Sequence, residues 1–168
     1  SRVLVGEMRP DAIIGVDVNH DYVAAPGIGD KRMAPIEMGK GFTMSVGSIV
    51  SEQLNQRIET VARDQDIPMQ RDVVGADTGT DGMAGVLGNV DCAATSVGMP
   101  IRNMHTISES GCTRDVLACT HAVAATLQAM DAEETTTGTL ASAFRGNHPR
   151  LDQARGLDHQ GSGPEATS

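Results

Sequence analysis

The side chains best suited to chemistry stand where apolar segments end. Asp17 lies at the end of the apolar segment 12–18, and His105 lies in the loop after a second apolar segment, 93–97. A carboxylate at the end of a buried strand must be solvated, paired or metal-bound, because burying a bare charge is costly. A neutral imidazole is a good ligand for zinc or cobalt. Position alone does not decide whether these residues bind a metal, since Asp17 could be a surface residue and His105 a hydrogen-bonded loop residue.

Other polar side chains surround these two. Glu109 and Asp115 follow His105 and either could orient it by hydrogen bonding, although Asp115 could instead stabilise the start of a helix. Lys40 stands between two glycines, where it could reach a substrate carboxylate as a mobile point charge or be an exposed loop lysine.

Patterns for other kinds of catalysis are absent. The glycine-rich segment 75–88 contains no Walker motif and no Gly-x-Gly-x-x-Gly, so its Thr80 and Asp81 are better interpreted as groups that fix a loop near a site. There is no Gly-x-Ser-x-Gly elbow and no His-Glu-x-x-His. The three cysteines have no metal-ligand spacing and are typical of small core residues.

These residues must be positioned by an α/β fold, because apolar strand patterns alternate with helical ones. Strands are predicted at 12–18, buried on both faces as in a parallel sheet, and at 42–46, 69–74 and 93–97. Helices are predicted from a Ser48 or Ser51 cap to before Pro68, at 83–88, and from Thr113 to about Met130. The apolar face of the last helix is predicted to comprise Val116, Leu117, Cys119, Val123, Ala124 and Leu127.

The composition restricts the partners. The 168 residues carry a formal net charge of -9, include only two lysines, and contain one Tyr, two Phe and no Trp. Such acidity argues against nucleic acid and fits a high-salt cytoplasm, where screening weakens self-repulsion. We find no run of 18 apolar residues and no signal peptide, so the prediction is a cytoplasmic protein without a membrane partner.

Four ordered stretches then carry a resemblance. They are Ile14-Gly15-Val16-Asp17-Val18, Met38-Gly39-Lys40-Gly41, Thr80-Asp81-Gly82, and Pro100-Ile101-Arg102-Asn103-Met104-His105-Thr106 with Glu109. Together they resemble the second half of the tetrahedral (TET), or glutamyl, aminopeptidase family, which is also labelled endoglucanase-like. The similarity spans residues 1 to about 131. It implies part of a three-layer α/β/α sandwich of the zinc-aminopeptidase type. The composition beyond it, poor in large apolar residues, indicates a polar tail, 132–168, of unknown role.

The resemblance also implies a role for each candidate. Asp17 and His105 would each bind one of two divalent ions, zinc or cobalt, in a metallo-aminopeptidase that hydrolyses amino-terminal residues from peptides. Lys40, Thr80, Asp81, Arg102 and Glu109 would contact substrate or support the ligands. Asn103, Thr106 and Gly82 depart from the family's usual Tyr, Ser and Ala, which bears on substrate preference.

The family's remaining ligands and its general-base Glu lie upstream of the strand that matches 12–18. The chain begins at Ser1 and reads as though cut from a longer sequence, so we expect it to be inactive alone, with an N-terminal half as its missing partner. The family also implies a homo-oligomer, possibly a dodecamer. The alternative is a non-catalytic, peptidase-like fragment that acts as a binding or assembly subunit. Polysaccharide hydrolysis is disfavoured by the scarcity of aromatic residues and of paired carboxylates.

Overall fold

The structure is a computed structural model that describes residues 2–25, 35–75 and 92–137. In chain order the elements are α1 (Arg2–Met8), β1 (Ala12–His20), β2 (Phe42–Val46), α2 (Glu52–Asp64), β3 (Met69–Val73), β4 (Ala93–Arg102), β5 (Ser110–Gly111) and α4 (Thr113–Thr137). The helix predicted at 83–88 and the tail after residue 137 lie outside the described residues.

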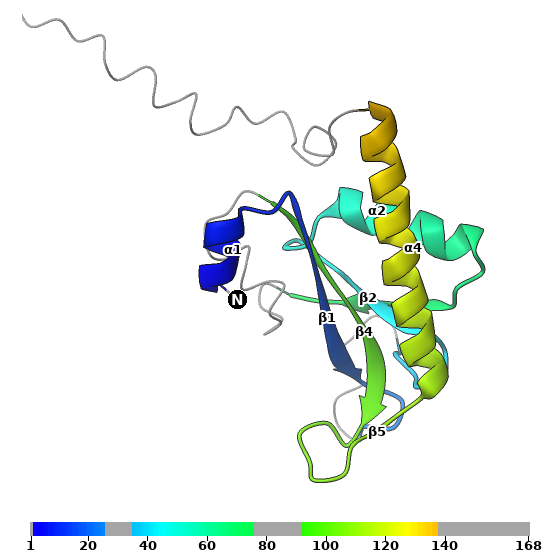
Figure 1. Ribbon diagram of the computed structural model, residues 1–168. Coiled ribbons are helices and arrows are strands. Elements are labelled where there is room, and N and C mark those ends of the chain that lie inside the picture. The colour runs from blue at the N-terminus through cyan, green and yellow to red at the C-terminus, as the bar shows by residue number, and fades with distance from the viewer. Residues whose placement is uncertain (1, 26–34, 76–91, 138–168) are drawn as a thin grey trace, which may run out of the picture.

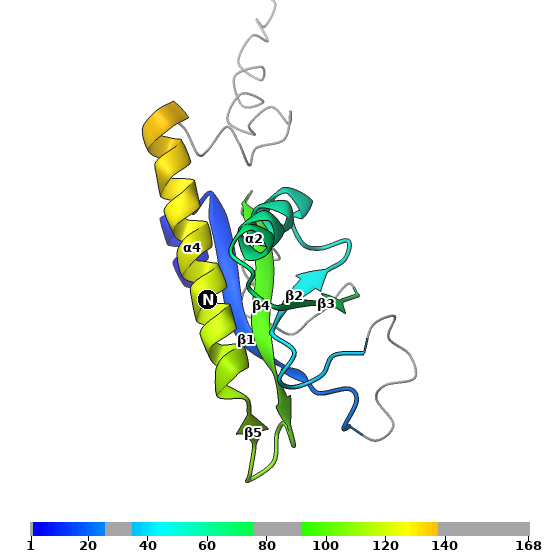
Figure 2. The ribbon, with the colours of Figure 1, turned by 90° about the vertical axis from the view of Figure 1, so that its right-hand side faces the viewer.

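The strands form a mixed sheet in the order β1-β4-β2-β3, with β5 paired to β4 (Figure 1; β3 is labelled in Figure 2). β1 runs parallel to β4 from Ala12 opposite Ala93 to His20 opposite Ile101. β2 is parallel to β3 and meets β4 in a short antiparallel contact. Helices α2 and α4 pack against each other and against both β2 and β4, so they form one layer on one face of the sheet (Figure 2). The predicted α/β class is confirmed.

The core lies between the sheet and this helical layer. Phe42 and Met44 of β2 and Leu54 of α2 are completely buried there. The helix predicted to end before Pro68 is α2, and Ser51 is its N-cap, because its hydroxyl accepts a hydrogen bond from the Leu54 main-chain N–H at 3.3 Å. Of the two serines considered as the cap, the structure selects the second.

β1 differs from its prediction. It was expected to be buried on both faces, but it is the edge strand of the described sheet, and Val16 and Val18 are 58% and 39% exposed. A continuous apolar run is typical of a strand with cover on both sides, whereas here Ala12 and Ile14 pack against the core and the second half of β1 is left uncovered. β1 also continues to His20, so Asp17 lies within the strand rather than at its end.

The predicted face of α4 is likewise wrong in part. Val116, Leu117 and Leu127 are 42%, 63% and 52% exposed, whereas Ala118, Ala122 and Ala125 are buried. Small side chains let the helix lie close to the sheet, and this close packing turns the larger apolar side chains outward. Within the described residues no helix is both long and apolar enough to cross a membrane.

Candidate active site

Asp17 lies on the face of the sheet opposite α2 and α4. Successive side chains of a strand point to opposite faces of the sheet. Ile14 of β1 packs on the helical side, as does Val97 of β4, which lies opposite Val16, so Asp17 points to the other face. Its Oδ1 accepts a hydrogen bond from the Val18 main-chain N–H at 2.8 Å, and its side chain is half-buried. The other side chains on this face include several polar ones: Asn19, Thr43, Ser45, Asp72 and Ser96.

Asn19 links the strands across this polar face. Its amide nitrogen donates to an Asp72 carboxylate oxygen at 2.7 Å, and its amide oxygen accepts from the Thr43 hydroxyl. The intervening residue on β4 is Gly98, where an added Cβ would stand 2.6 Å from the Asn19 Oδ1 and 2.5 Å from the Asp17 carbonyl oxygen. A glycine is therefore required for the Asn19 side chain to cross β4. The hydrogen bonds of Asn19 then hold the part of β1 that carries Asp17 in place.

His105 stands on the loop between β4 and β5. Its side chain is exposed and its φ is +65°, a left-handed backbone conformation that non-glycine residues rarely adopt. The loop is held in this shape, since Glu109 accepts a hydrogen bond from the His105 main-chain N–H at 2.7 Å and Thr106 bonds the Asn103 carbonyl. Glu109, expected to orient His105, thus fixes its main chain.

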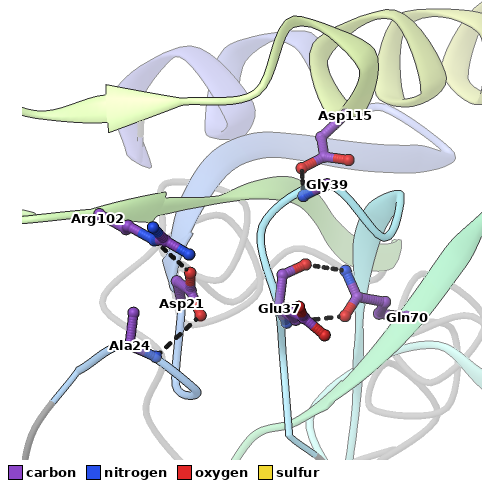
Figure 3. Close-up of polar contacts among 7 residues, drawn as sticks. All are labelled: Asp21, Ala24, Glu37, Gly39, Gln70, Arg102 and Asp115. Carbon is purple, nitrogen blue, oxygen red and sulfur yellow. Dashed lines mark hydrogen bonds and ion pairs between the residues drawn. The ribbon is translucent and has the colours of Figure 1, made fainter.

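An ion pair between the buried Asp21 and the half-exposed Arg102 connects this loop to β1 (Figure 3). Asp21, directly after β1, has no exposed side-chain surface and accepts hydrogen bonds from the Arg102 Nε at 2.8 Å and the Ala24 N–H at 3.2 Å. Burial alone raises the pKa of Asp21, but these bonds, the Arg102 charge and a bond from the Met38 main chain outweigh burial and lower the pKa below its usual value near 3.8. Arg102 therefore anchors the start of the His105 loop to the end of β1.

Asp115 does not contact His105. It is completely buried in the first turn of α4 and accepts a hydrogen bond from the main-chain N–H of Gly39 at 2.6 Å (Figure 3). It accepts a second one from the main-chain N–H of Gly41 at 2.9 Å. Lys40, between them, is exposed. Of the two roles considered for Asp115, its place in the first turn of the helix is confirmed, and the structure adds a further role, because Asp115 also fixes the loop that carries Lys40.

The predicted site residues are thus only partly brought together. Arg102 and Glu109 hold the two ends of the His105 loop, whereas Thr80 and Asp81 lie outside the described residues. Over the described ranges, no group of three or more His, Cys, Asp or Glu side chains is arranged to hold a metal ion. Asp21 was missed by sequence reasoning, because its pairing with Arg102 depends on β4 being the parallel neighbour of β1, which no local pattern encodes.

Comparison with solved structures identifies proteins that share this fold. The fold matches solved aminopeptidase structures, each with 74% of this chain covered. An aminopeptidase from Desulfurococcus kamchatkensis matches with a TM-score of 0.64 at 22% identity over 36% of its chain, and a TET aminopeptidase from a marine-sediment Thaumarchaeota archaeon with 0.64 at 20% over 35%. The dodecamer PhTET1-12s matches with 0.58 at 21% over 35%.

Sequence comparison identifies the family. The model of the M42 glutamyl aminopeptidase family matches residues 1–121, so the chain belongs to that family. The lysyl aminopeptidase of Pyrococcus furiosus is 30% identical over 112 residues, which are 67% of this chain and 32% of that protein. The chain thus spans about a third of the length of the relatives it matches.

Proposed function

We propose that this chain is part of a dinuclear, metal-dependent aminopeptidase that hydrolyses amino-terminal residues from peptides. Asp17 and His105 each bind one of two divalent ions, zinc or cobalt. The observation that carries the proposal is the family match across residues 1–121, the segment that includes both side chains. Carboxylate oxygen and imidazole nitrogen are suitable donors for either ion.

The surroundings of the two residues support this assignment. Asp17 is half-buried on the polar face. The His105 side chain is exposed and, among the described residues, its imidazole makes no hydrogen bond, so its nitrogens are available. When bound, two such ions acidify a water and polarise the scissile carbonyl. The chain's own contribution is to position the ligands: Asn19 fixes β1, Arg102 anchors the His105 loop and Glu109 fixes the His105 main chain.

The remaining parts of the site are proposed to lie outside this chain. They include the general-base Glu, further ligands and the N-terminal half of the peptidase domain. The uncovered β1 edge, with Val16 and Val18 exposed, is a suitable surface for that half to cover. Residues 1–131 would then be the C-terminal part of the catalytic domain, and 132–168 a tail of unassigned role.

Several finer features belong to the same proposal. Arg102 and Glu109 support the ligands as described, and Lys40, Thr80 and Asp81 are proposed to contact substrate or to shape its surroundings. A solved relative is a dodecamer, which supports a homo-oligomer here. The cytoplasmic location and the adaptation to high salt stay predictions from composition.

The alternative function is that of a non-catalytic, peptidase-like subunit that binds or assembles with another chain. The described residues contain no cluster of three potential ligands, which is compatible with this alternative and equally with a peptidase whose other ligands lie outside this chain. The two functions differ in whether Asp17 and His105 are needed for chemistry.

An assay of aminopeptidase activity distinguishes the two proposed functions. We expect this chain alone, with zinc or cobalt added, to release no amino-terminal residues from peptides in low or molar salt. A polypeptide that also contains the proposed N-terminal half should release them, and Asp17→Asn or His105→Gln should abolish release. His121→Gln, which changes an exposed histidine on α4, is the matched control and should leave activity unchanged. Turnover by this chain alone, or full activity of both ligand variants, would contradict the proposal.

A further inference from the structure

We draw no further inference here: the strongest candidate, the groove of about 540 Å³ between α2 and α4, carries nothing, because its Arg57 and Glu133 side chains are paired with each other, the unpartnered Thr126 hydroxyl beside it is completely buried, and nothing in the structure shows what would occupy it.

Discussion

Replacing Asp21 by Asn tests whether its ion pair with Arg102 holds the site together. Asn keeps the shape of the side chain and can still accept from Ala24, but its amide group cannot replace the carboxylate that binds Arg102. A hydrogen bond to a charged group contributes about 1.5–3 kcal/mol, and breaking a fully buried pair costs about 3–5 kcal/mol. Arg102 is 47% exposed and stays solvated, which places the cost at about 2 kcal/mol.

The effect should depend on pH in a defined direction. The pKa of Asp21 is lower in the folded chain than its usual value near 3.8, so folding favours the ionised carboxylate. Its stabilisation is complete above that usual value and is lost as the pH falls through the lower, folded-state pKa. The wild type and Asp21→Asn should therefore differ most at neutral pH and converge in strong acid.

Urea denaturation at a series of pH values measures this difference. At neutral pH we expect a loss of about 2 kcal/mol, or roughly 4–8 °C in melting temperature for a domain of this size. Asp64→Asn is the matched control, since Asp64 is exposed and forms a surface pair with Arg63 at 3.5 Å, and it should cost less than about 0.5 kcal/mol. A neutral-pH difference for Asp21→Asn as small as that of the control, or one unchanged in strong acid, would refute the reasoning.

Three further predictions follow from single contacts. Gly41→Ala should destabilise the fold by about 3 kcal/mol or more in urea, because its Cβ collides with main chain at a positive φ; Gly75→Ala has open space and should be nearly neutral. At pH 8 iodoacetamide should label Cys112 well before Cys119, as mass spectrometry would report, because bonds from Arg114 lower the pKa of Cys112 while burial raises that of Cys119 to about 11. Thr126→Val should raise stability by up to about 1 kcal/mol, since this buried hydroxyl has no hydrogen-bond partner among the described residues; a loss of stability would reveal one.

Local sequence signals predicted much of the fold. The strand at 42–46 and the helix after Ser51 follow from short-range patterns of hydrophobicity, capping and a following proline, and the structure reproduces them. The apolar face of α4 was misassigned because its periodicity does not show which side meets the sheet. That choice depends on the small alanines, which permit close packing only where β2 and β4 lie opposite them.

The site was less predictable for a related reason. Asp17 and His105 stand at informative positions, but Asp21, Asn19 and Asp115 act through partners 53 to 81 residues away in sequence. Such pairings depend on strand order and on the absence of a side chain at Gly98, and no local pattern encodes either. The roles of Thr80 and Asp81 stay predictions.

The central claim is that Asp17 and His105 are metal ligands, and a cobalt titration tests it most directly. Visible absorption of Co²⁺ reports nitrogen and carboxylate coordination without requiring turnover. We predict that the chain develops a cobalt spectrum with weak affinity, that Asp17→Asn and His105→Gln each weaken or remove it, and that His121→Gln leaves it unchanged. An identical spectrum and affinity in the wild type and in both ligand variants would contradict the account.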